Sequence, residues 1–173
     1  MKLTKEQLQE IMKMQQEMDT LALKNNNIDE NEDLTEEKYI ALKVELHEFM
    51  NEIESFKFWK KHKGKENKLE EAIDVIHFIL SMMNDYDYEI VDDLEITDKQ
   101  MEHMENKSIN EIYIMTDALL VDAYMNCDWV KMLEAILMGV LIMISKCGFT
   151  SEDIYNEYIR KNKINRERQN KGY

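Results

Sequence analysis

The sequence has no proline, only four glycines and only two cysteines among its 173 residues. Proline and glycine are the strongest helix breakers, so long helices are unhindered here, and Leu, Glu, Lys, Met and Ala fill long stretches. Cys127 and Cys147 lack the Cys-x-x-Cys spacing of a zinc site, and we expect buried free thiols rather than a disulfide. These absences and this composition predict an all-α protein.

A long apolar run and a basic surface are also missing. The most apolar stretch, Val130 to Ser145, is too short to span a membrane and carries Lys131 and Glu134, and the polar amino terminus does not resemble a signal peptide. We therefore expect a cytoplasmic protein with no membrane partner. The formal net charge of −14 argues against nucleic acid as a general partner, because such binding requires a basic face.

Capping signals and helical periodicity recur along the chain. We expect a single domain over residues 1–173, a bundle of about five or six helices, with a small helical insert at about 85–107 as an option. The expected segments run from Thr4 to about Lys24, from Thr35 to about Ser55, from Asn67 to at least Met83, from Thr97 over a short stretch, from Ser108 to about Asn126, from Asp128 to Cys147, and from Thr150 into the basic tail.

Two pairs of carboxylates stand out on successive helices. Glu45 and Glu48 are three residues apart, as are Glu71 and Asp74, so each pair shares one face of its helix. On an exposed helix such a pair usually means nothing more than a solvated face. Two such pairs on neighbouring helices are more informative, because together they surround one space with four carboxylates.

The third helix is apolar nearly all round from Ala72 onward, which predicts a central position in the bundle. Its only polar side chains between Ala72 and Met83 are Asp74, His77 and Ser81, which form a narrow stripe. Burial of an ionised aspartate is costly unless it faces charge, metal or water. The plain structural alternative is an Asp74–lysine pair beside a hydrogen-bonded core histidine.

An oxygen-only set of four carboxylates suits Mg²⁺, which binds through a few carboxylates and substrate phosphates. This preference indicates phosphate ester or anhydride chemistry. A di-iron centre is the rival interpretation, but it requires Glu-x-x-His motifs on two helices, and only Asp74-x-x-His77 approximates one.

The chain resembles the all-α nucleotide pyrophosphatase (MazG-like) superfamily, whose hallmark is Glu-x-x-Glu followed by Glu-x-x-Asp. Within it, the chain is most similar to the dimeric dUTPases. The segments that carry this resemblance are MQQEMD at 14–19, VELHEFMNEIESFKFWK at 44–60, EEAIDVIHFILS at 70–81 and KNKINRERQNKGY at 161–173. The segment from Asp85 to about Tyr155 carries no matching motif.

The resemblance implies hydrolysis of dUTP to dUMP and pyrophosphate by a homodimer. It implies Mg²⁺ bound by Glu45, Glu48, Glu71 and Asp74, with Glu48 activating the attacking water. For substrate binding it implies a base pocket and phosphate contacts formed by Gln16, Lys57, Phe58, Trp59, His77, Phe78, Lys161, Asn165 and Arg168.

Asp19 departs from the family pattern, in which an asparagine often follows the base-reading glutamine by three residues. An ionised aspartate cannot donate a hydrogen bond, so dCTP stays open as a substrate, as does dUDP. Two further hypotheses are a relative with broader nucleotide specificity and a non-enzymatic helical interaction protein. A panel of nucleotides distinguishes the first from a dUTPase, and the absence of Mg²⁺-dependent stabilisation would favour the second.

Overall fold

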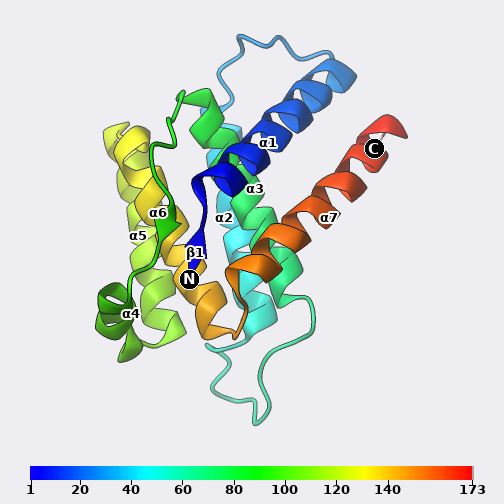
Figure 1. Ribbon diagram of the computed structural model, residues 1–173. Helices are drawn as coiled ribbons and strands as arrows, with labels where there is room; N and C mark the ends of the chain where they lie inside the picture. Colours follow the sequence, from blue (N-terminus) through cyan, green and yellow to red (C-terminus); the bar gives the residue numbers. More distant parts are fainter. Residues whose placement is uncertain (173) are drawn as a thin grey trace.

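A computed structural model describes residues 1–172, and within them seven helices make up most of the chain (Figure 1). The all-α class is confirmed. The helices exceed the expected number because the short segment after Thr97 forms a complete element. Their bounds are α1 (Lys5–Asn26), α2 (Thr35–Ile53), α3 (Lys68–Asp85), α4 (Asp98–Glu105), α5 (Ile109–Asn126), α6 (Trp129–Lys146) and α7 (Ser151–Asn170). Tyr173, the end of the predicted domain and of the predicted basic tail, lies outside the described residues.

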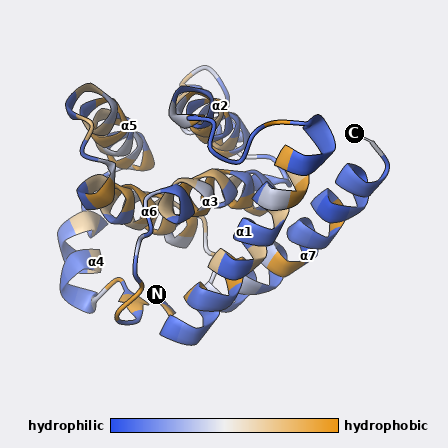
Figure 2. Ribbon diagram, turned by 90° about the horizontal axis from the view of Figure 1, so that it is seen from above, coloured by the Kyte–Doolittle hydropathy of each residue, from blue (hydrophilic) through white to orange (hydrophobic). Residues whose placement is uncertain are grey.

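The long helices form three layers, as the view in Figure 2 shows. Helices α3 and α6 pack together in the middle, α2 packs on α3 and α5 on α6 on one side, and α1 and α7 cover α3 on the other. The central position of α3 confirms the prediction from its apolar circumference, and Ile73, Ile76 and Leu80 are almost fully buried. Because α3 contacts α1, α2 and α7, its polar side chains lie where three helices meet.

Helix α6 supplies much of the remaining core through Leu133, Ile136 and Val140, each with no measurable exposure. Most of the apolar Val130–Ser145 stretch therefore belongs to the core, although Val130 itself is exposed. Across residues 1–172, no single helix meets the length and hydropathy needed to cross a membrane, although α6 and α7 would pass that test as a pair bent by 108°.

The helix ends follow the capping signals closely. The hydroxyl groups of Thr4, Thr97 and Ser108 each accept a hydrogen bond from the backbone N–H three residues later, and the side chain at that position accepts one from the backbone N–H of the cap residue. Gly148, which follows the C-cap residue Cys147 of α6, adopts φ +92°, a conformation in which a side chain is strained.

A two-stranded antiparallel pair was not predicted. Lys2–Leu3 (β1) pairs with Leu94–Glu95 (β2) and ties the amino terminus to the acidic connection after α3. Two-residue strands have no measurable alternation, so only tertiary pairing reveals them.

The prediction of buried thiols was wrong for Cys127, which is exposed. Cys147 is half-buried, and both cysteines are free.

Candidate active site

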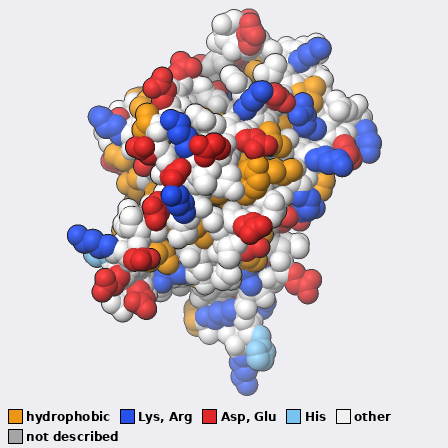
Figure 3. Space-filling model, viewed as in Figure 1, with side chains coloured by type: hydrophobic (Ala, Val, Ile, Leu, Met, Phe, Trp, Pro, Cys, Tyr) orange, Lys and Arg blue, Asp and Glu red, His pale blue; other side chains and the backbone are white. Residues whose placement is uncertain are grey.

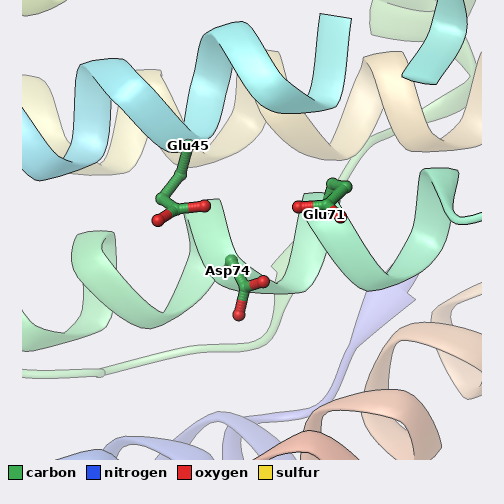
Figure 4. A group of neighbouring side chains, drawn as sticks. All are labelled: Glu45, Glu71 and Asp74. Atoms are coloured by element: carbon green, nitrogen blue, oxygen red, sulfur yellow. The ribbon is translucent and has the colours of Figure 1, made fainter. Parts of the chain in front are cut away.

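Three of the four predicted carboxylates converge between α2 and α3. Figure 4 shows Glu45 extending from α2 toward the first turns of α3, where Glu71 and Asp74 lie. One oxygen of each carboxylate lies within 4.8 Å of the others, and all three residues are half-buried. This spacing allows all three to bind a single cation.

Glu48 borders this cluster without joining it. It lies one turn after Glu45 on α2 and is exposed. Its charge nevertheless raises the pKa of both Glu45 and Glu71, so its carboxylate is electrostatically coupled to them. Glu48 therefore lies at the edge of the three converging carboxylates.

The cluster is electrostatically unfavourable by itself. Burial, followed by the charges of Asp74, Glu48 and Glu71, raises the pKa of Glu45 to about 7. Burial is also the largest cause of the raised pKa of Glu71 and of Asp74. Like charges held together at a half-buried position favour protons or a cation. Carboxylate oxygens are the ligands of hard divalent cations, so the residues present fit such an ion.

A buried lysine adjoins the same carboxylates. Lys161 Nζ lies 2.7 Å from Asp74 Oδ2 and 2.8 Å from Glu70 Oε1, and its side chain is 7% exposed. Arg160 contacts the second oxygen of Glu70 at 3.2 Å. The Asp74–lysine pair considered from sequence thus exists; Lys161 contacts only Asp74 among the three converging carboxylates, and its charge partly offsets the rise in the pKa of Glu45 and Glu71. Glu70 was not among the predicted site residues.

The polar stripe of α3 continues into a buried network beyond the carboxylates. His77 is 7% exposed, and its Nδ1 lies 2.6 Å from Gln15 Oε1. The hydroxyl of Tyr158 on α7 also donates to that oxygen, at 2.8 Å, and Gln15 Nε2 donates to Asp19 Oδ1 at 2.8 Å. Burial lowers the pKa of His77 to about 3, so its ring is neutral.

The glutamine in this network is Gln15, whereas the predicted substrate-binding glutamine is its neighbour Gln16. Gln15 is buried, whereas Gln16 is exposed and lines a surface hollow with Lys13 and Asn84. Helical spacing explains why Gln15 is the buried residue. It follows Leu8 by seven residues and Ile11 by four, so it lies on the same buried face of α1. Gln15, and not Gln16, therefore contacts His77 and Tyr158, while the base-reading role of Gln16 stays a prediction.

The aromatic and basic residues after α2 lie apart from this network. Phe58 and Trp59 are 87% and 63% exposed and pack edge to face against each other. Lys57 donates to Glu54 rather than to any carboxylate of the cluster. Figure 3 shows cationic side chains gathered over this loop at the bottom of the molecule. The structure does not bring these three residues to Gln15 or His77.

The remaining predicted residues have different environments. Phe78 packs against the core, half-buried, and Asn165 is half-buried on α7. Arg168 is exposed, but its charge lowers the pKa of Asp74, which places it within electrostatic range of the cluster. Tyr158 was missed, although it precedes Lys161 by three residues and therefore faces the same side of α7.

An all-α fold with a carboxylate cluster between two helices, a buried lysine beside it and a polar network beyond it defines a candidate hydrolase site for phosphorylated ligands. The sequence model of one family, described as dUTPase, matches residues 7–173. The chain belongs to this family and is a hydrolase of dUTP-type nucleotides. A search of curated proteins found no match.

Proposed function

We propose that the protein hydrolyses dUTP to dUMP and pyrophosphate, with Mg²⁺ held by Glu45, Glu48, Glu71 and Asp74. The observation that carries this proposal is the convergence of three half-buried carboxylates from α2 and α3, with ligand atoms within 4.8 Å. Burial and neighbouring charges raise their pKa values, an unfavourable arrangement that a bound cation would relieve. Family membership supplies the nucleotide.

Glu48 is the general base in this proposal. When bound, Mg²⁺ supplies charge neutralisation to the phosphate oxygens and makes water in the site more acidic. Glu48 is exposed at the edge of the cluster, so its carboxylate is free of burial and positioned to take the proton of the attacking water. The more buried carboxylates of Glu45, Glu71 and Asp74 would bind the Mg²⁺ whose positive charge this step requires.

Lys161 and Arg168 bind the phosphates, with Asn165 between them on α7. Lys161 already lies beside Asp74, and the charge of Arg168 reaches the same carboxylate. Ammonium and guanidinium groups form charge-assisted hydrogen bonds to phosphate oxygens. The cationic loop that carries Lys57 and the exposed aromatic rings of Phe58 and Trp59 supplies further contacts to the nucleotide.

The base lies toward the far end of the polar stripe. Asp74, His77 and Ser81 succeed one another on α3. At about 1.5 Å per residue, Asp74 and Ser81 are roughly 10 Å apart along the helix. That separation suits a nucleotide whose phosphates lie at Asp74. Its base would then lie near His77, Phe78 and the predicted substrate-binding residue Gln16 on α1.

The proposed active form is a homodimer that associates through the exposed face of α2 and α5. These helices lie side by side through Tyr39 and Tyr124, whose rings stack at 4.5 Å, and through an ion pair of 2.7 Å between Lys43 and Asp117. Their outer surface, the α2–α5 face, is apolar. Its large exposed side chains are Ile40, Val44, Ile114, Val121 and Met125.

The net charge of the chain favours a second copy of the same chain as the partner that binds the α2–α5 face. Two chains with a net charge of −14 repel one another, so they associate best through a surface poor in carboxylates. Adjacent exposed apolar side chains on a monomer mark an interaction site. A two-fold axis would pair this face with itself and bury it.

The test of the catalytic proposal is Glu48→Gln, assayed for pyrophosphate release from dUTP with Mg²⁺. Loss of the base is expected to lower kcat by about 10²–10⁴-fold without unfolding the protein. Glu36→Gln, at an exposed position in the first turn of the same helix, is the matched control. Near-normal turnover by folded Glu48→Gln would remove Glu48 from this role.

A thermal shift experiment tests the site without turnover. Mg²⁺ with a non-hydrolysable dUTP analogue is expected to raise the unfolding temperature, because a ligand that binds only the native state stabilises it by mass action. Asp74→Asn is expected to reduce this shift. An equal shift in both proteins would show that the ligand binds elsewhere.

A further inference from the structure

Glu70 binds two cations of α7 although it is not one of the three converging carboxylates. It lies in the first turn of α3, and its Oε1 accepts a hydrogen bond from Lys161 Nζ at 2.8 Å. Its Oε2 accepts one from the guanidinium group of Arg160 at 3.2 Å. Arg160 also donates to Glu157 on its own helix, at 2.6 Å. Both oxygens of Glu70 are thus occupied by side chains of α7.

Lys161 is shared between Glu70 and Asp74. Its Nζ lies 2.7 Å from Asp74 Oδ2, and its side chain is 7% exposed. Figure 4 shows the carboxylate of Asp74 on the side of α3 turned away from α2, whereas Glu45 extends from α2 toward α3. An ammonium group has three N–H donors, and Asp74 and Glu70 accept from two of them. One donor of Lys161 is therefore left for a third acceptor.

A divalent cation at the three converging carboxylates would compete with Lys161 for Asp74. Both are positive, and both require the charge of this one carboxylate. A buried ammonium group that loses its counter-charge is costly, because it has little contact with water. Glu70 supplies a second counter-charge, which already lies 2.8 Å from Lys161 Nζ. The ammonium group can therefore keep its position when the cation binds.

We propose that Glu70 is a positioning residue for the active site, which holds the Lys161 ammonium group in place when Mg²⁺ binds Asp74. Lys161 then keeps one N–H for a phosphate oxygen of the nucleotide. Glu70 contacts neither the cation nor the substrate and acts only through Lys161. This inference rests on the proposed function, because it requires Mg²⁺ at Glu45, Glu71 and Asp74.

Two simpler roles for Glu70 predict different results. If its ion pairs only join α3 to α7, their loss lowers the free energy of unfolding but leaves the affinity for Mg²⁺ unchanged. If its negative charge only attracts the cation through space, its effect on that affinity does not depend on Lys161. The proposed role requires both an effect on the affinity for Mg²⁺ and a dependence of that effect on Lys161.

Calorimetry with Mg²⁺ alone, without nucleotide, measures the first requirement. In Glu70→Gln the dissociation constant for Mg²⁺ is expected to rise by at least about tenfold, because Lys161 then has only Asp74 as a counter-charge. Glu157→Gln is the matched control. It removes a carboxylate that binds Arg160 rather than Lys161, and it should change the constant by less than about twofold. An unchanged affinity for Mg²⁺ in folded Glu70→Gln would overturn the inference.

A double-mutant cycle with Lys161→Met measures the second requirement. In that background Glu70 has no ammonium group to hold, so Glu70→Gln should weaken Mg²⁺ binding by a clearly smaller factor, about threefold or less. A loss of affinity that is as large as in the unmodified background, or larger, would show that the charge of Glu70 acts on the cation directly. That result would also overturn the inference.

Steady-state kinetics with dUTP show which step depends on Glu70. Glu70→Gln should raise KM for dUTP and the half-saturating concentration of Mg²⁺. It should change kcat at saturating Mg²⁺ by less than about threefold, because Glu48 and the three converging carboxylates are intact. A fall in kcat with both of the other constants unchanged would overturn the inference and leave the dUTPase proposal intact. An unmodified protein that neither binds Mg²⁺ nor hydrolyses dUTP would overturn both.

Discussion

Lys161 Nζ lies 2.7 Å from Oδ2 of Asp74, one of the three carboxylates that converge between α2 and α3. The lysine is thus held by the same side chain that we propose as a metal ligand. Burial lowers the pKa of Lys161, but the hydrogen bonds that its ammonium donates to Asp74 and Glu70 outweigh this effect and raise the pKa. The ammonium group therefore stays charged and neutralises part of the cluster.

Lys161→Met should destabilise the metal-free protein. The change keeps most of the buried aliphatic stem but leaves Asp74 and Glu70 without their shared cation. Breaking a fully buried pair costs about 3–5 kcal/mol, and the partial exposure of Glu70 reduces the expected loss to roughly 2 kcal/mol. Urea unfolding without metal measures it.

Mg²⁺ should reduce this loss, because a second cation then serves the same carboxylates. Lys163→Met, an exposed lysine on the same helix, is the control and should change stability little. Equal destabilisation with and without Mg²⁺ would separate Lys161 from the proposed metal cluster.

The close approach of α5 and α6 gives a prediction about stability that is independent of function. A Cβ added at Gly139 would lie 2.2 Å from Thr116 Oγ1, which donates a hydrogen bond to the backbone of Ile112. Gly139→Ala should therefore lower the free energy of unfolding by about 1–3 kcal/mol, despite the better helix propensity of alanine. Thermal or urea unfolding checks it.

A double variant identifies the cause of that loss. Thr116→Ala removes the clashing oxygen, so Gly139→Ala should be much less harmful in its presence, with a coupling energy of about 1 kcal/mol or more. Strictly additive effects of the two changes would show that the steric contact is not responsible.

The carboxylate pairs and the polar stripe could be predicted from sequence because helix geometry fixes them locally. Residues three or four apart share a face wherever the helix is placed, which links Glu71 to Asp74 and Asp74 to His77. The helix boundaries were predictable for the same reason, since capping boxes act within one turn.

Tertiary packing decided what the sequence left undetermined. The burial of Gln15 follows from its spacing with Leu8 and Ile11, but its contacts with His77 and Tyr158 arise only because α3 and α7 pack against α1. The pairing of β1 with β2 connects residues more than 90 positions apart. None of these contacts has a periodic signature in the local sequence.

Glu54 gives the protein a pH-dependent element at the end of α2. Its side chain is buried, and its Oε1 accepts hydrogen bonds from Lys60 at 2.6 Å and from Lys57 at 2.9 Å. These contacts lower the pKa of Glu54 from 4.5 to about 2. The folded state therefore holds this proton less tightly than the unfolded state does.

The stabilisation from Glu54 is thus fully present above about pH 4.5 and is lost as the pH falls toward about 2. Glu54→Gln should be less stable than the unmodified protein at neutral pH, and the two should converge on acidification. Urea midpoints across this range measure the difference, with exposed Glu66→Gln as the control. A difference that persists at the acid end would mean that packing, not charge, is responsible.

The α2–α5 face should hold two copies of the chain together. Ile114 and Val44 are 62% and 46% exposed on neighbouring helices, and an interface that buries them loses affinity when they carry charge. Val44→Glu combined with Ile114→Glu should convert a dimer to a monomer in light scattering after size exclusion. Val91→Glu changes a side chain that is 66% exposed and lies outside this face, and it should leave the dimer intact. Because α2 also carries Glu45 and Glu48, the monomer's Mg²⁺-dependent thermal shift would then show whether the metal site needs its partner. A protein that is monomeric before any substitution, or a dimer that survives the double change, would rule out this face.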